Sequence, residues 1–291
     1  MMKMKNMKTT MTNRRIGDLA LEAVLVEVSV TPKPGLVDRN NSGSHSDMDF
    51  FTFMKSAAAL RSCFERCADA AGLFLFPRGI LSDLRGIGLD TEEAMLKATG
   101  GINTHKGEIF SLGILSGCAG FLLAHGEPLE AENILNHAAA FCDGVIEHDF
   151  VHAKAKPPEL RTKGERIWVA CGIAGARGEA RAGYPSVRNA GLPALTKYLA
   201  DGMSINDALA FTLIHIMAVN YDTNIISRRD LDTAEEVMKT AENLIAEGLT
   251  LGKLSALDSE FISRNISPSG SADLLAVTYF IYALTHPSPS L

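Results

Sequence analysis

The sequence predicts an all-α protein that folds as one multi-helix, bundle-like domain. Apolar residues recur at spacings of three and four along most of the chain, which is the period of an amphipathic helix. Alternating β-branched runs closed by hairpin turns are almost absent, because VEVSV (26–30) reads more simply as the end of a helix that Pro32 and Pro34 stop. Long polar loops separate the apolar stretches, and we expect the functional site to be built from them.

The elements follow from this periodicity in chain order. Ile16, Ala20 and Val24 lie on one face of a first helix. A second stripe from Phe53 to Phe74 predicts a single helix of about six turns. The same reasoning predicts helices at 91–99, 106–124, 129–147, 165–176, 187–200, 205–220, 231–247, 253–263 and 271–284.

The domain organisation is simple. We expect residues 1–12, rich in Lys and Met, to be a disordered tail, and residues 13–291 to form a single all-helical catalytic domain. A chain of 291 residues can bury about three quarters of its unfolded surface, so it needs no disulfide or metal for stability. The segment 148–164 is the best candidate for a mobile lid.

Composition limits the class of partner and the compartment. The net charge of −6 argues against a general nucleic-acid or anionic-membrane binder. No uninterrupted run reaches the 18 apolar residues of a membrane span. The five cysteines, an odd number without a CxxC pair, indicate reduced thiols rather than a disulfide framework. We therefore expect a cytoplasmic protein; the sequence does not fix its oligomeric state and is compatible with a homo-oligomer.

The loop after the first helix contains the first candidate residues. Lys33 lies between two prolines, which stiffen the backbone and suit an ammonium group presented to an anion. Asp38 could serve as a base or a metal ligand, although a helix-terminating loop with solvated charges explains both residues as well. Glu27 lies on the apolar face of the preceding helix, where a carboxylate is costly unless it is paired or points into a site.

Further loops contain acidic and basic groups in short runs. Asp47 and Asp49 precede an apolar helix, so they could bind Mg²⁺ or simply cap the helix. In TGGINTHKG (99–107), Asn103, His105 and Lys106 lead into a helix whose first N–H groups suit a phosphate; a glycine-rich turn with a surface lysine is the alternative.

Two later loops extend this pattern. In GARGEARAGYPSV (175–187), Arg177 offers a bidentate fork for phosphate, or forms a structural pair with Glu179. Asp222 and Asn224 follow a buried helix, and Asp222 is a candidate for metal binding or acid–base work. The chain contains no G-x-x-x-x-G-K-[ST] and no G-x-G-x-x-G, so any use of ATP proceeds without those phosphate loops.

Read together, the loops resemble the triphosphoribosyl-dephospho-coenzyme A synthase family, which serves citrate lyase and malonate decarboxylase. The matching stretches occur in family order: EVSVTPKPGLVDRNNSGSHSDMDFFTF (27–53), TGGINTHKGEIFSLG (99–113), ARGEARAGYPSV (176–187), DTN (222–224) and ISPSGSADLLA (266–276). Two positions depart from the family pattern. Ser269 stands where the family commonly has glycine, and SRRD (227–230) replaces a His-Arg-Gly-Gly-like turn.

The resemblance implies an all-α fold and an unusual use of ATP. Its triphosphoribosyl group would move to the 2′-hydroxyl of 3′-dephospho-CoA with release of adenine, and the product would pass to the acyl-carrier subunit of the lyase system. Such a transfer needs groups that bind phosphate, for which the candidates are Lys33, Asn103, Lys106, Arg177, Asn224 and Ser271. Mg²⁺ would accompany the triphosphate, with Asp47, Asp49 and Asp222 as candidate ligands.

The transfer also needs acid–base groups. The candidates are Asp38, Glu179, Asp273, Glu27 and His105, the last as a proton donor to adenine. Two other classes of function remain open on the same scaffold. One is a nucleoside triphosphate glycohydrolase or phosphatase, and the other is a non-catalytic nucleotide-binding protein, which the altered SRRD and SPSG turns would favour.

Overall fold

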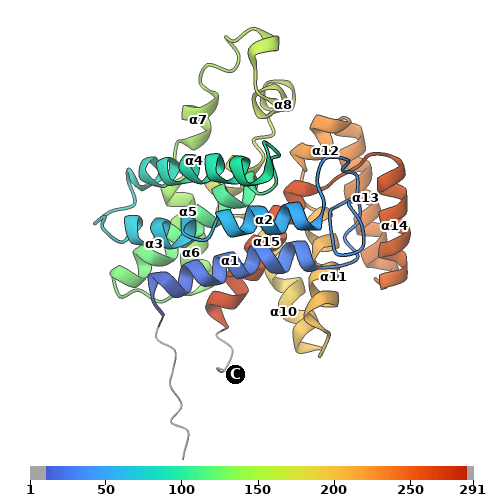
Figure 1. The fold of residues 1–291 in the computed structure, drawn as a ribbon, viewed down its shortest axis with the longest axis horizontal. Coiled ribbons are helices and arrows are strands. Elements are labelled where there is room, and N and C mark those ends of the chain that lie inside the picture. The colour runs from blue at the N-terminus through green and yellow to red at the C-terminus, as the bar shows by residue number, and fades with distance from the viewer. Residues whose placement is uncertain (1–10, 287–291) are drawn as a thin grey trace, which may run out of the picture.

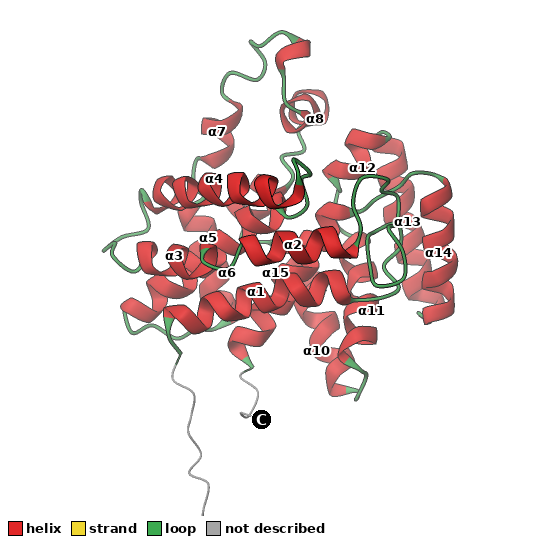
Figure 2. Cartoon of the chain, viewed as in Figure 1, coloured by secondary structure: helices red, strands yellow, loops and turns green. Residues whose placement is uncertain are grey.

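The computed structural model describes residues 11–286 of the chain, and within them every regular element is a helix (Figures 1 and 2). The elements are α1 (Asn13–Ser29), α2 (Phe50–Ala59), α3 (Cys63–Ala71), α4 (Ile80–Thr99), α5 (Lys106–Ala124), α6 (Ala131–Phe141), α7 (Val145–Phe150), the 3₁₀ turn η1 (Pro158–Leu160), α8 (Lys163–Cys171), α9 (Ala176–Arg181), the π-helical turn η2 (Val187–Gly191), α10 (Leu192–Ala200), α11 (Ile205–Met217), α12 (Thr223–Arg228), α13 (Leu231–Glu247), α14 (Leu251–Ser263) and α15 (Ser269–Thr285). The all-α prediction is confirmed. The predicted tail falls on residues 1–12, of which 1–10 lie outside the described residues, and Thr12 caps α1 by accepting a hydrogen bond from the Arg15 amide.

Helix α5 is the centre of the fold and is buried on nearly every side. It contacts α1, α3, α4, α6, α9 and α15. Its contact with α3 is close because Gly120 has no side chain: a Cβ there would lie 2.3 Å from the carbonyl oxygen of Ala68. Helix α5 is also the one described helix that is long and apolar enough to cross a membrane, but 78% of its apolar window is buried inside the fold, as expected of a core helix.

Helix α15 joins the two halves of the molecule. It packs against α1 and α5 on one side and against α10, α11 and α12 on the other. Figure 1 shows α13 and α14 flanking this second group, while α7 and α8 project from the body on a separate arm. One continuous hydrophobic core extends from Ile16 to Leu284, so the described residues share a single core.

Several predicted helix limits are wrong for identifiable reasons. The stripe over 53–74 forms two helices, α2 and α3, separated by a turn at residues 60–62. Its apolar residues are still buried, because periodicity reports the buried face and not the continuity of the backbone. The predicted helix 129–147 is likewise divided into α6 and α7, at Gly144, whose φ of 75° is left-handed.

Two short helices were not predicted and lie in segments assigned to loops. Helix α9 occupies residues 176–181 and α12 occupies residues 223–228, and both are only six residues long. Helix α4 begins at Ile80, well before the predicted start at 91, and contains Gly86 and Gly88, which weaken the sequence signal of a helix. The first turns of α5, α9, α12 and α15 turn out to be where the candidate residues gather.

Candidate functional site

Three glycines bring the candidate loops into contact. A Cβ at Gly107, in the first turn of α5, would lie 1.9 Å from the Oδ2 atom of Asp273 on α15. A Cβ at Gly270 would lie 3.1 Å from the Oδ1 atom of Asp222, and one at Gly175 would lie 3.0 Å from the side chain of Thr223. The segments 99–107, 175–187, 222–224 and 266–273 therefore meet at one place, as the loop-built site requires.

Lys33 and Glu27 form a buried ion pair at the edge of this cluster. The Lys33 ammonium lies 2.5 Å from the Glu27 carboxylate, and the two side chains are only 2% and 3% exposed. Burial raises the pKa of Glu27, and the adjacent Lys33 opposes that effect. Of the two predictions for Glu27, pairing with a core cation is thus confirmed. The same pairing keeps Lys33 from reaching an anion in solvent.

Asp38 organises the loop in which Lys33 lies. One of its carboxylate oxygens accepts hydrogen bonds from the Thr31 hydroxyl at 2.7 Å and the Lys33 amide at 3.1 Å. The other accepts from the amides of Asn40 and Asn41 at 2.6 and 3.1 Å. With four donors, the buried carboxylate fixes the backbone of residues 31–41, and its catalytic role stays a prediction.

Asp222 connects α12 to α15. It is the N-cap of α12, where it accepts from the Asn224 amide at 2.9 Å. It also accepts from the amide and hydroxyl of Ser271 at 2.7 and 3.0 Å. Asn224 and Ser271 therefore belong to the site through Asp222. Burial raises the pKa of Asp222, although these hydrogen bonds oppose the rise.

Asp273 and Glu108 add two more carboxyl groups beside Glu27. Burial raises the pKa of Asp273 well above its ordinary value, and the charges of Glu27 and Asp222 raise it further. Asp273 retains partial exposure, whereas Glu108 is 2% exposed. Burial raises the pKa of Glu108 as well, with Glu27 and Asp273 contributing. The negative charge of each carboxylate disfavours ionisation of its neighbours, and this repulsion adds to the effect of burial on the pKa of Glu108 and Asp273.

Sequence reasoning missed Glu108. It lies two residues after Lys106, where an acidic residue in the first helical turn is explained by the helix dipole alone. The missed signal is that apolar and small residues follow Glu108 on every side of this helix as far as Leu122, which leaves α5 no solvated face to present a glutamate. A carboxyl group in such a helix indicates a buried polar cluster.

His105 is completely buried behind the cluster. Its Nδ1 atom lies 2.5 Å from the Ser56 hydroxyl, which also accepts a hydrogen bond from Thr104 at 2.6 Å. Burial and the nearby charge of Lys33 lower the His105 pKa to about 3. Its Nε2 atom lies 3.7 Å from Glu108 Oε2, and neither atom has a hydrogen-bond partner. The contact that His105 makes is therefore with Ser56, and its predicted proton donation to adenine stays a prediction.

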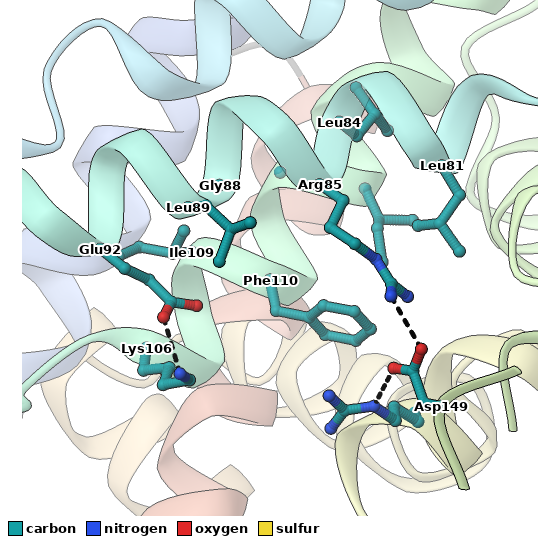
Figure 3. A pocket seen from close by; sticks show the side chains of 13 residues that line it. Leu81, Leu84, Arg85, Gly88, Leu89, Glu92, Lys106, Ile109, Phe110 and Asp149 are labelled. Carbon is teal, nitrogen blue, oxygen red and sulfur yellow. Dashed lines mark hydrogen bonds and ion pairs between the residues drawn. The ribbon is translucent and has the colours of Figure 1, made fainter. Parts of the chain in front are cut away.

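Lys106 and Arg177, two predicted phosphate ligands, line one cavity of about 310 Å³ between α4, α5 and α9 (Figure 3). Lys106 pairs with Glu92 at 2.6 Å. Arg177 and Arg85 both contact Asp149 of α7, at 2.5 and 2.8 Å. Burial alone would raise the Asp149 pKa, but the hydrogen bonds from Arg177, His148 and Arg85 outweigh it and lower the pKa to about 2. Arg85 and Asp149 were not predicted.

The remaining candidates lie nearby with local partners. Glu179 accepts from the hydroxyl and amide of Ser186 at 2.7 and 3.2 Å, so it does not form the predicted pair with Arg177. Burial raises its pKa. Asn103 accepts from the Lys106 amide at 3.3 Å and fixes the start of α5.

The acidic residues proposed as metal ligands do not meet. Asp49 is the N-cap of α2 in a capping box with Thr52, and Asp47 is mostly exposed, 3.9 Å from His45. Across residues 11–286 no group of three or more His, Cys, Asp or Glu side chains is placed to hold a metal ion. Such a donor set fits Mg²⁺ only if the triphosphate and water supply most of its ligands, as is common for this ion.

The structure accounts for both departures from the family pattern. Ser269 does not have a positive φ, so glycine is not required there. In SRRD, Asp230 is the N-cap of α13, and Arg228 donates to the Ser44 carbonyl, Asn265 and His45. The altered turn therefore anchors the loop 31–49 to α12 and α14.

Comparisons with known proteins identify the family of the chain. Residues 13–290 match the family model described as ATP:dephospho-CoA triphosphoribosyl transferase. The chain is 42% identical to a 2-(5″-triphosphoribosyl)-3′-dephosphocoenzyme-A synthase of Klebsiella pneumoniae, over 90% of this chain and 88% of that one. It is also 42% identical to a protein of the same name from Pectobacterium atrosepticum, over 89% and 86% of the two chains. A probable synthase from Vibrio cholerae is 42% identical over 93% and 88%.

No solved structure matches this chain. The family match extends over almost the whole described fold, and the relatives are covered nearly end to end. The chain belongs to the ATP:dephospho-CoA triphosphoribosyl transferase family.

Proposed function

We propose that this chain moves the 5-triphosphoribosyl group of ATP to the 2′-hydroxyl of 3′-dephospho-CoA and releases adenine. One observation carries the residue-level proposal: Asp273, a partly exposed carboxyl group with a raised pKa, lies against Gly107 where the first turns of α5 and α15 meet. The proposal assigns Asp273 as the general base. The two other classes considered, a glycohydrolase or phosphatase and a non-catalytic nucleotide-binding protein, lack a comparable observation.

The bond changes define what the site must do. Asp273 takes the proton of the acceptor 2′-hydroxyl, and the oxygen attacks C1′ of the ATP ribose. The C1′–N9 bond breaks, and adenine leaves with the electron pair and acquires a proton. A single displacement inverts the β-linked donor to an α-linked product, through a transition state with oxocarbenium character like that of glycoside hydrolysis.

The remaining residues hold the charges around this centre. Lys106 and Arg177 exchange their carboxylate partners for phosphate groups of the substrates, and Arg85 assists as the second cation on Asp149. We assign Lys33 to keeping Glu27 ionised beside Asp273, because its ammonium is enclosed. Mg²⁺ would neutralise the triphosphate, with the phosphates and water as most of its ligands, because Asp47, Asp49 and Asp222 do not form a shared site.

We further infer the biological setting from the resemblance. The product would be the prosthetic-group precursor of the acyl-carrier subunit of citrate lyase or malonate decarboxylase. The reaction would take place in the cytoplasm, and a homo-oligomer is compatible with it.

The test is a product analysis. Protein, Mg²⁺, ATP and 3′-dephospho-CoA are incubated, and the nucleotides are separated by chromatography. The proposal predicts adenine and the triphosphoribosyl product in equal amounts, with no adenine when the acceptor is omitted. Adenine without acceptor would identify a glycohydrolase, and ADP or phosphate would overturn the transferase.

The base assignment has its own test in the pH profile. Ionised Asp273 is the active form, so the rate should rise with pH through the raised pKa and then level off. Asp273→Asn should lose this dependence and about 10²–10⁴-fold of the rate while ATP binding stays near wild type. A variant that keeps the wild-type rate and profile would assign the base elsewhere.

A further inference from the structure

The cavity between α4 and α5 is mainly apolar in its middle and charged at its two ends. Its apolar wall consists of Leu81, Leu84, Leu89, Ile109, Phe110 and Ile114. Figure 3 shows the Lys106–Glu92 pair on one side of Phe110 and the Asp149–Arg85 pair on the other. Asp149 also pairs with Arg177. Leu89 is 60% exposed, which leaves a large apolar side chain at the mouth of the cavity uncovered.

This lining excludes a triphosphate from the middle of the cavity. Burying phosphate charge against leucine, isoleucine and phenylalanine side chains is unfavourable, because the lost hydration of the charge is not replaced by hydrogen bonds or ion pairs. A neutral, branched chain with a few amide groups would bury its apolar surface there and meet the charged pairs at its ends. A volume of about 310 Å³ lies at the lower end of the range for small-molecule sites, which suits one slender segment of a ligand.

We propose that this cavity holds the pantetheine arm of the acceptor, an inference that rests on the proposed function. Of the two substrates, ATP has no apolar chain, whereas dephospho-CoA carries a dimethyl-substituted arm with two amides and a thiol. The wall of the cavity includes the first turns of α5, at Lys106, Ile109 and Phe110. Gly107 of the same helix touches Asp273, so the acceptor diphosphate would pass Lys106 at the start of α5 and place its adenosine ribose at the base.

Gly88 allows a selective obstruction of the cavity. It lines the cavity on α4, and a Cβ there would meet only the Ile109 Cγ2 atom, at 3.9 Å. The Gly88→Leu side chain would therefore occupy space meant for the arm. Gly86 provides a matched control on the same helix, since a Cβ there meets nothing within 4 Å and the residue does not line the cavity. Both substitutions raise helix propensity by a similar amount, so a difference between the two variants reports on the cavity and not on folding of the helix.

The experiment compares wild type, Gly88→Leu and Gly86→Leu with two acceptors at saturating ATP. Dephospho-CoA carries the arm, and ADP presents the same 2′-hydroxyl without it. Gly88→Leu should raise KM for dephospho-CoA about tenfold or more, in line with lost pocket contacts, and leave KM for ATP unchanged. Its kcat/KM with ADP should equal that of wild type, and Gly86→Leu should match wild type throughout.

A Gly88→Leu variant that binds dephospho-CoA as well as wild type, or that loses ADP and dephospho-CoA turnover equally, would overturn the assignment. Calorimetric titration of dephospho-CoA into each variant without ATP separates this inference from the proposed function. If wild type releases no adenine, the transferase proposal fails, and the difference in dephospho-CoA affinity between Gly88→Leu and Gly86→Leu still decides the ligand of the cavity.

Discussion

Lys33 and Glu27 form a buried ion pair whose energetic contribution can be measured directly. The pair lies at 2.5 Å with almost no exposure, so removal of either partner leaves an unpaired charge in a dry region. The remaining group has no route to water without moving the loop that Asp38 fixes. The charge of Glu27 also raises the pKa of Asp273.

Lys33→Met should lower the free energy of unfolding by about 3–5 kcal/mol, because Glu27 is left ionised or must take up a proton. Urea denaturation measures the change. Lys239→Met, which breaks an exposed pair with Glu242, should cost less than about 1 kcal/mol and serves as the control. Equal losses in the two variants would mean that the Glu27 pair is not buried in solution.

Gly107 is a second residue at which a small substitution tests the site, because a single added Cβ atom would meet the Asp273 carboxylate. In Gly107→Ala the new Cβ would lie only 1.9 Å from Asp273 Oδ2, so the carboxyl group must move. A displacement of this kind should lower kcat/KM for adenine release by about 10²-fold. Gly164→Ala, where no atom lies within 4 Å, should leave the rate unchanged. An active Gly107→Ala enzyme would show that Asp273 is not the base.

The residues also show what sequence reasoning could reach. The clustering of the loop motifs was predictable, because several polar segments interrupt a helical chain that needs only short connections. The partners of each side chain were not: Glu179 bonds Ser186 instead of Arg177, and Arg177 bonds Asp149, which lies 28 positions away. Such choices depend on how helices cross, and helix crossing leaves no local pattern in the chain.

At the scale of elements, the arm formed by α7, η1 and α8 contacts the body where α8 meets α12 and α7 meets α9, and Asp149 adds two ion pairs to this attachment. This residue joins α7 to Arg85 of α4 and Arg177 of α9, while residues 151–162 beyond it are largely exposed. The predicted lid at 148–164 coincides with this arm. Its attachment at Asp149 gives a direct way to release it.

Asp149→Ala should free the arm and speed protease cleavage within residues 151–162, because two ion pairs to separate helices are lost together. Mass spectrometry of limited digests locates the cuts. Glu147→Ala is the matched control on α7, since Glu147 is 61% exposed and pairs only with Arg181. Cleavage at the same rate in both variants would mean that Asp149 does not anchor the arm.

For the whole molecule, helix α5 connects the core to the chemistry. Its first turn touches Asp273, and its later turns pack closely against α3 at Gly120 and Ala68. The all-α class was predictable from periodicity along the chain, yet the central place of α5 was not, because a helix that is apolar all round shows no preferred face. Stability and catalysis should therefore be separable along this one helix.

Gly120→Ala tests that separation. Its Cβ would lie 2.3 Å from the Ala68 carbonyl oxygen and 2.6 Å from the Ala68 Cα, so the backbones of α3 and α5 must move apart. Overpacking of this kind should cost about 1–3 kcal/mol, measured by urea denaturation, with kcat/KM of the folded enzyme unchanged. Gly117→Ala should cost less, because its nearest neighbour is the flexible end of Leu84.

Gly107→Ala should show the reverse, a slow enzyme of near-normal stability. If Gly120→Ala slowed catalysis as much as Gly107→Ala does, the core and the site would be mechanically coupled through α5, and the assignment of separate roles to its two ends would be wrong.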